Sequence, residues 1–448
     1  MGRWTGNLLG IAIAVGIVGF LLVQYGASKA CDATIDDGVS YDVQISGCSV
    51  LIATGGTSDI PVATAYNNRA VAYHDQSKWD LAAADYDASL KLRPDDAVTV
   101  ANRGQLYADI GQAKMAMVLL NQAIAAKPDY AAAYSKRGLL YEAKGDYKRA
   151  MADHDRAVEL TPDDDDAFYK RASTLFEMRE YERAIADYTK CLTLNPNRML
   201  AHNNRASAYE GNGEYDKAIA DYTRAIELDP DYAQAYSNRG WTLTSKGEHD
   251  LALADYDKAL AMTPEHADSY AGRGRTYVRK GDYKRGIEDL DAALKIAPRD
   301  PRTYEERGYA YRLLKDYDRA IADYTQAATF DPASGAPLEM RCWTRGIANR
   351  DLIGARSDCE EAERLGVSKT VVRESLCFVR YRLGEYDKAL ADCDVALAGN
   401  PKLAYALYVR GLAKRRTGQP ASANTDIAAA KALEATVVED FAGYGVVD

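Results

Sequence analysis

Small apolar and aromatic positions alternate along most of this chain, and the alternation repeats every 34 residues. Within one period, residues 199–232, Tyr222 and Ala225 fall three apart on one helical face, Gly213 separates two helical stretches, and Pro230 closes the second. Glycine tolerates positive φ at a helix end, whereas proline lacks an amide donor and stops a helix. Each period is therefore predicted to form two helices joined by a tight turn. Eight prolines mark the period without a slip: Pro94, Pro128, Pro162, Pro196, Pro230, Pro264, Pro298 and Pro332.

The period extends from about Ala63 to about Ala435 with no linker-like stretch inside it. A fixed period of this length means that each unit buries its apolar face against its neighbours rather than in one central core. The sequence therefore predicts one elongated all-α array, although 448 residues would suggest about three domains on length alone. The expected divisions are a signal peptide or membrane anchor at 1–30, an N-terminal cap segment with a cysteine pair at 31–62, the array at 63–435 and a tail at 436–448.

Several units carry a large, a small and an aromatic residue on the first helix, followed by Ala, an aromatic residue, Ala and Pro on the second. Two examples are Tyr134, Gly138, Tyr141, Ala150, His154, Ala157 and Pro162, and Tyr304, Gly308, Tyr311, Ala320, Tyr324, Ala327 and Pro332. This pattern resembles the tetratricopeptide repeat family over more than four-fifths of the chain. The resemblance implies a right-handed superhelical solenoid of helix-turn-helix units, about eleven here, which start near Ala63, Ala97, Ala131, Asp165, Met199, Ala233, Ala267, Pro301, Glu339, Thr370 and Ala404.

The ninth unit departs from the pattern. Pro337 and Gly346 predict a first helix that begins late, near Glu339, and a loop to Ala355 that is three residues short.

Arginine stands just before the small residue of the first helix in ten of the eleven units, where the family more often has an aliphatic residue. Aspartate stands just before the usual aromatic residue of the second helix in ten units as well. Because the two positions face each other across a hairpin, their matched numbers favour a ladder of charge-assisted bonds, within or between units, over a row of anion-binding arginines. One rung is Arg239 with Asp255. The other arginines are Arg69, Arg103, Arg137, Arg171, Arg205, Arg273, Arg307, Arg345 and Arg410, and the other aspartates are Asp85, Asp153, Asp187, Asp221, Asp289, Asp323, Asp358, Asp392 and Asp426.

The N-terminus carries an unbroken apolar run, Leu8 to Val23, after Arg3. Its 16 residues lie between the core of a signal peptide and a full membrane span, so cleavage and anchoring both stay open. Either outcome predicts an exported protein, periplasmic or anchored in the inner membrane with the array on the periplasmic side, because Arg3 holds the N-terminal end inside.

The seven cysteines fit an oxidising compartment. Two pairs lie about equally far from the turns of the ninth and tenth hairpins, so antiparallel helices would bring each pair face to face. A third pair shares the segment before the first unit. The alternative is that all of them are small core residues, and a zinc site is not favoured because no short-spaced Cys or His pairs are present. The expected disulfides are Cys31 with Cys48, Cys342 with Cys359 and Cys377 with Cys393, with Cys191 left as a buried small residue.

No catalytic or cofactor motif is found: the five histidines are scattered, and no nucleophile elbow, phosphate loop or dinucleotide fingerprint occurs. The chain is therefore not expected to be an enzyme or to hold a cofactor or metal. For the acidic run Asp163 to Asp166, helix capping is favoured over a calcium site. The net charge of −10 argues against nucleic acid and anionic lipid as partners, which leaves residues 8–23 as the expected membrane contact.

A protein or peptide partner is the remaining expectation. In the family that the chain resembles, the first helices line a concave groove that takes an extended or helical segment. From the sixth unit on, the positions expected to face it carry aromatic residues beside arginines, the composition that binding hot spots favour. The arginines favour acidic partners. The candidate groove residues are Trp241, Arg275, Tyr309, Arg312 and Trp343.

The chain also resembles exported bacterial repeat proteins of the cell envelope. Two hypotheses follow: an interaction scaffold in the envelope, or an accessory subunit that presents or regulates a separate envelope enzyme.

Overall fold

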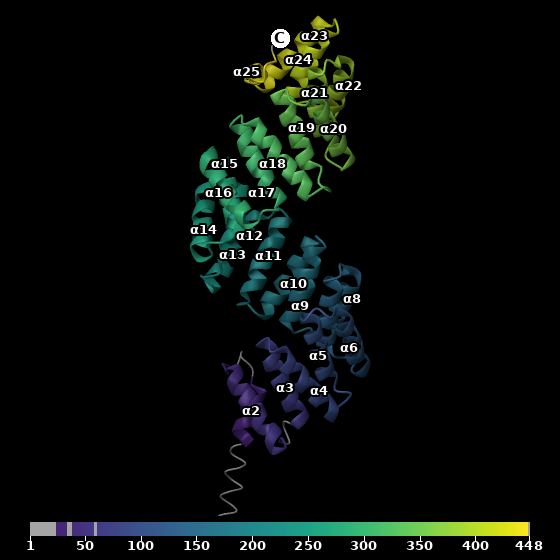
Figure 1. The fold of residues 1–448 in the computed structure, drawn as a ribbon, viewed down its shortest axis with the longest axis vertical. Coiled ribbons are helices and arrows are strands. Elements are labelled where there is room, and N and C mark those ends of the chain that lie inside the picture. The colour runs from purple at the N-terminus through teal and green to yellow at the C-terminus, as the bar shows by residue number, and fades with distance from the viewer. Residues whose placement is uncertain (1–23, 34–37, 58–60, 447–448) are drawn as a thin grey trace, which may run out of the picture. The chain divides into compact units, whose positions relative to one another are not determined.

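The computed structural model describes residues 24–33, 38–57 and 61–446, and within these ranges every regular element is a helix (Figure 1). The chain divides into two compact units, Met1–Asp221 and Tyr222–Asp448. The all-helical repeat architecture predicted from the 34-residue period is confirmed in both.

In the first unit, residues 24–32 are helical and precede a regular series of hairpins. Helices α2 and α3 pack together, and the later helices pair as α3–α4, α5–α6, α7–α8 and α9–α10. The bounds are α2 (Tyr41–Thr54), α3 (Val62–Asp75), α4 (Trp79–Leu92), α5 (Ala97–Asp109), α6 (Ala113–Ala126), α7 (Ala131–Glu142), α8 (Tyr147–Leu160), α9 (Asp165–Glu177), α10 (Tyr181–Leu194) and α11 (Met199–Gly211), with α12 (Tyr215–Leu228) running into the second unit.

The second unit continues the series and ends in a short extra helix. Its hairpins are α13–α14, α15–α16, α17–α18, α19–α20, α21–α22 and α23–α24. The bounds are α13 (Ala233–Lys246), α14 (His249–Met262), α15 (Ala267–Arg279), α16 (Tyr283–Ile296), α17 (Pro301–Leu313), α18 (Tyr317–Phe330), α19 (Ala336–Ala348), α20 (Leu352–Arg364), α21 (Lys369–Arg382), α22 (Tyr386–Gly399), α23 (Ala404–Arg416), α24 (Pro420–Leu433) and α25 (Val437–Gly443).

Aromatic side chains of the second helices pack against small residues of the first. Tyr256 and Tyr324 are fully buried. A Cβ atom added at Gly240 would lie 3.0 Å from the ring of Tyr256, and one at Gly308 would lie 2.9 Å from the ring of Tyr324. The aromatic ring therefore packs directly on the small residue, and a larger residue there would not fit, which explains why the two recur together.

The Arg–Asp positions form bidentate ion pairs inside the hairpins. Arg239 donates from Nε and Nη2 to the two carboxylate oxygens of Asp255, both at 2.7 Å, and its Nη1 donates to Thr223 Oγ1 of the preceding hairpin at 2.9 Å. The hydrogen bonds to Asp255 raise the pKa of Arg239. Arg239 thus ties its own two helices together and also bonds to the hairpin before it. The same within-hairpin pairing joins Arg69–Asp85, Arg137–Asp153, Arg171–Asp187, Arg205–Asp221, Arg273–Asp289, Arg307–Asp323 and Arg410–Asp426.

Three rungs differ from the expected pairing. In the ninth hairpin the bidentate partner of Asp358 is Arg341, and Arg345 adds a third bond at 2.7 Å. In the tenth, Asp392 is shared by Arg373 and Arg380. Arg103 pairs with Asp87 of the preceding hairpin because Leu119 stands where its own aspartate would be.

The late start expected for the first helix of the ninth hairpin was wrong. Helix α19 begins at Ala336 with Pro337 in its first turn. Proline is well tolerated there because the first amide groups of a helix have no intrahelical acceptor. The loop to α20 spans residues 349–351, as long as the 314–316 loop of the neighbouring hairpin, and is therefore not short.

The structure joins three cysteine pairs as disulfides. The Cα–Cα distances are 4.6 Å for Cys31–Cys48, 5.6 Å for Cys342–Cys359 and 5.1 Å for Cys377–Cys393. Cys191 is a buried free thiol whose pKa is raised to about 11 by that burial.

No helix among the described residues is long and apolar enough to cross a membrane. The expected signal or anchor run, 8–23, lies outside them.

The C-terminal segment folds back over first helices of the last hairpins. Phe441 of α25 is fully buried, with its ring centroid 5.1 Å from that of Phe378 in α21 and 4.9 Å from that of Tyr408 in α23. Arg382 of α21 donates to the carbonyl oxygen of Tyr444. Residues 437–446 therefore cover the inner side of α21 and α23.

Candidate partner-binding groove

The first helices of consecutive hairpins lie next to one another in the second unit: α13, α15 and α17 are in contact in succession, and so are α19, α21 and α23. One position recurs along these helices every 34 residues, with Trp241, Arg275, Tyr309 and Trp343 as its occupants, and Phe378 follows 35 residues after Trp343. Side chains at equivalent positions of adjacent first helices can therefore touch. The Arg275 guanidinium lies 4.2 Å from the Trp241 ring centroid, and the rings of Trp343 and Phe378 are 5.5 Å apart.

A cavity of about 560 Å³ opens over α13, α15 and α17. This volume falls in the range of ordinary ligand pockets. Its lining combines the apolar surface of Trp241, Tyr256 and Ala271 with the amides of Gln234 and Asn238. Trp241 is 37% exposed, which is unusual for so large an apolar side chain and leaves part of its ring open to a partner.

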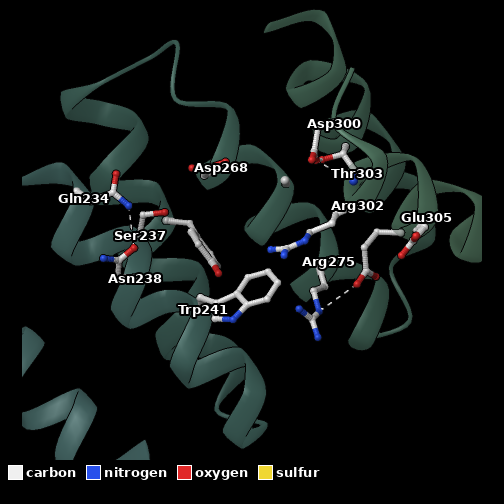
Figure 2. A pocket seen from close by; sticks show the side chains of 13 residues that line it. Gln234, Ser237, Asn238, Trp241, Asp268, Arg275, Asp300, Arg302, Thr303 and Glu305 are labelled. Atoms are coloured by element: carbon white, nitrogen blue, oxygen red, sulfur yellow. Dashed lines mark hydrogen bonds and ion pairs between the residues drawn. The ribbon is translucent and has the colours of Figure 1, made fainter. Parts of the chain in front are cut away.

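Two arginines enter this pocket, and only one of them forms an ion pair with a described residue. Arg275 forms an ion pair with Glu306 at 3.2 Å. Arg302, at the start of α17, points into the cavity toward Trp241 (Figure 2) and makes no ion pair with any residue that the structure describes. Arg302 is thus the cation available to an incoming group, a role that the sequence analysis assigned to Arg275.

Glu305 lies in the same lining one turn from Arg302. Burial, with a further contribution from the nearby charge of Glu306, raises its pKa to about 6, although Arg302 acts in the opposite direction. Near neutral pH the carboxylate is ionised, and the lining carries both signs of charge.

Tyr309, Arg312 and Trp343 lie beyond the Trp241 pocket. The Arg312 guanidinium is 5.0 Å from the Tyr309 ring centroid. Arg312 and Trp343 line a smaller cavity of about 270 Å³, built by α17, α19, α21 and α23. Of the five candidate residues, the structure places Trp241 with Arg275 in one pocket and Arg312 with Trp343 in another, whereas Tyr309 lines neither.

Sequence reasoning missed the acidic residues of the groove. Glu305, Glu339 and Glu374 occupy equivalent positions on α17, α19 and α21, two residues before the rung arginine or its equivalent. In the preceding two hairpins the same position holds Ser237 and Ala271. The sequence therefore carries a signal for these residues. It is visible only when equivalent positions of successive units are compared, and not when each glutamate is considered alone.

The remaining candidate sites are accounted for by local bonding. Asp164 caps α9, accepting from the amide of Asp166, and Arg198 pairs with Asp165 and Asp166 at 2.7 Å each. Among the described residues, no group of three or more His, Cys, Asp or Glu side chains is arranged to hold a metal ion.

Two family models, both described as tetratricopeptide repeat, match residues of both compact units. Together they cover more than half of the chain: 63–96, 165–198, 200–232 and 233–266 for one, and 102–165 and 271–337 for the other. The chain belongs to the tetratricopeptide repeat family. It is accordingly a protein–protein interaction scaffold in type, and proteins of this family are generally non-catalytic.

The chain is similar to several solved structures. The anaphase-promoting complex heterotetramer Cut9–Hcn1 is 14% identical with a TM-score of 0.51, over 90% of this chain and 93% of that chain. A tetratricopeptide repeat protein from Parabacteroides merdae is 22% identical with a TM-score of 0.48, over 56% and 98%. YrrB, described as having an unusual peptide-binding site, is 24% identical with a TM-score of 0.36, over 41% and 95%. No curated protein matches the sequence significantly.

Proposed function

We propose that this tetratricopeptide repeat protein is an exported, non-catalytic scaffold of the bacterial cell envelope that holds an extended partner segment in the groove of its second unit. One observation carries the proposal: three successive first helices build a pocket in which a partly exposed tryptophan meets an arginine that forms no ion pair with a described residue. A large aromatic surface beside a guanidinium is the composition of interface hot spots.

The pocket's chemistry defines what the segment presents. An apolar side chain packs on the open part of the Trp241 ring, while the amides of Gln234 and Asn238 border the path of the backbone. Arg302 receives a carbonyl or carboxylate oxygen of the segment. The second helices are committed to packing and ladder bonds, so the first helices supply the recognition surface.

Export is supported by the apolar run at 8–23 behind Arg3 and by the three cysteine pairs held at bonding distance. Disulfides of this kind persist in oxidising compartments. Mass mapping under non-reducing conditions, on protein purified from its native cells, is expected to recover all three linkages. Free thiols at all seven cysteines would contradict export.

Site-specific photo-cross-linking in native cells tests the groove. A photoreactive phenylalanine analogue at position 241 is expected to yield one discrete adduct in the envelope fraction, and the adduct should weaken when Arg302→Ala is added. Leu251 on the second helix α14 is the matched control, because it is 59% exposed and apolar but lies away from the pocket. Equal adducts at both positions, or none at 241, would show that this groove is not the binding surface.

A further inference from the structure

The smaller cavity is lined by two carboxylates and two aromatic rings. Its residues are Arg312, Glu339, Met340, Trp343, Val371, Glu374, Ser375 and Tyr405, contributed by four successive first helices. Its volume of about 270 Å³ lies just under the range for drug-sized ligands and suits one side chain of a partner.

The two carboxylates differ from the buried rung aspartates of the unit. The rung aspartates are each held by an arginine, as Asp255 is by Arg239 at 2.7 Å. Glu339 instead accepts one hydrogen bond from the Ser375 hydroxyl at 2.6 Å, and Glu374 accepts one from the backbone amide of Ala406. Neither carboxylate forms an ion pair with a described residue.

Burial raises the pKa of both groups. For Glu374 the nearby charge of Glu339 adds to burial and the pKa reaches about 7, although the bond from Ala406 acts against the shift. Arg312 lowers the pKa of Glu339, but it is one cation against two carboxylates. Tyr405 stays neutral, because burial and its hydrogen bond to Asp440 raise its pKa. The lining therefore holds two carboxylates that have no ion-pair partner among the described residues, and a cation that enters the cavity would favour their ionised forms.

The aromatic wall favours the same kind of guest. Trp343 and Tyr405 stack with their rings nearly parallel, at 15° and 5.9 Å between centroids. Phe378 packs against Trp343, with 5.5 Å between ring centroids, and Phe441 packs against Tyr405, with 5.4 Å between ring centroids. A ring face beside a carboxylate attracts a cation through both the π-system and the formal charge.

We propose that this cavity, lined by Glu339, Trp343, Glu374 and Tyr405, is a subsite for a lysine or arginine side chain of the partner segment. The proposal rests on the proposed function for the identity of the occupant as a protein segment. It also revises the expected charge preference: an acidic partner follows from the arginines alone, whereas the run of glutamates at this end of the groove selects a basic residue.

Fluorine NMR of protein labelled with 5-fluorotryptophan tests the subsite directly. The resonances of Trp343 and Trp241 are assigned by single Phe substitutions, and the labelled protein is titrated with the tripeptide Ac-Ala-Lys-Ala-NH2 and its neutral norleucine analogue. The Trp343 resonance is expected to shift with the lysine peptide, and with an affinity about tenfold or more above that of the analogue, as for one charge-assisted contact. The Trp241 resonance is expected to stay in place.

Glutamine variants separate the charge from the packing. Glu339→Gln with Glu374→Gln keeps the shape and hydrogen-bond acceptors, and is expected to remove the lysine preference. Glu288→Gln, which removes an exposed carboxylate from the second helix α16, is the control and is expected to leave it unchanged. In wild-type protein the lysine preference should increase from pH 6 to pH 8, since Glu374 loses its proton over this range and the cation binds the ionised form.

Three outcomes would overturn the inference: equal affinity for the two peptides, a preference that survives the double substitution, or tighter binding of free 1,5-diaminopentane than of the lysine peptide, which would indicate a small-molecule amine site. Failure of cross-linking at position 241 with a normal Trp343 titration would count against the proposed function and not against the subsite. Normal cross-linking at position 241 with no preference for the lysine peptide at Trp343 would contradict the subsite and not the proposed function.

Discussion

At the scale of single residues, the stability of each hairpin depends on a charge pair that is mostly hidden from water. The side chains of Arg239 and Asp255 are 20% and 9% exposed. Truncating either to alanine leaves its partner buried without a counter-charge, so a loss of roughly 1–3 kcal/mol of unfolding free energy is expected for each single variant. Urea denaturation followed by circular dichroism measures it.

The comparison is an ion pair of the same two residue types on the surface. Arg319 and Asp316 are 62% and 29% exposed, and breaking such a pair is expected to cost less than about 1 kcal/mol. Should Arg239→Ala denature at the same urea concentration as the parent, the ladder would not be structural and its arginines would be available to anions.

Glu305 provides a residue-level test of the pocket's electrostatics. Carbon NMR of the labelled carboxyl is expected to give a midpoint near 6, above the ordinary value of 4.5, because burial dominates the pKa. Since the folded state holds this proton more tightly than the unfolded chain, the group's contribution to stability falls as the pH rises from about 4.5 to about 6. Arg302→Ala should move the midpoint up and Glu306→Gln should move it down; a midpoint near 4.5 would mean that the carboxyl is solvated.

At the scale of helices, the repeat period predicted almost every first helix, and the exception is instructive. Pro337 suggested a late start for α19 because proline disrupts a helix interior, but the residue sits in the first turn, where it is tolerated. The earlier start of α19 also explains why Arg341 pairs with Asp358. Arg341 lies 34 residues after Arg307, the rung arginine of α17, whereas Arg345 lies one turn further along the helix.

The terminal helix α25 is an element that the period did not predict, because it lies beyond the last unit and carries no repeat signature. Its contacts come from Phe441, which reaches both α21 and α23. Phe441→Ala is expected to cost about 3–5 kcal/mol locally and to speed amide hydrogen exchange in α23 while leaving α13 unchanged. Glu439→Ala, an exposed change on the same helix, should have no such effect. Unchanged protection in α23 after the Phe441 substitution would show that the segment is not part of the fold's stable end.

At the scale of the whole molecule, the sequence predicted the class of protein far better than the details of its binding surface. The period determines which positions face inward, so Trp241 and Arg275 could be identified as neighbours. It does not show which arginines already form an ion pair. Arg275 pairs with Glu306, whereas Arg302 forms no ion pair with a described residue. That distinction depends on side-chain positions across adjacent hairpins, which no linear pattern records.

The central claim is that partner binding takes place in the groove of the second unit at Trp241. The most direct test is the affinity of the partner segment recovered by cross-linking for wild-type protein and for a Trp241, Arg275, Arg312 triple alanine variant. We expect the triple variant to lose at least about 30-fold in affinity, as for a single hot-spot residue worth about 2 kcal/mol, while circular dichroism shows both proteins to be folded. Leu251→Ala should bind like wild type. Equal affinity of the triple variant and wild type would place the binding surface elsewhere.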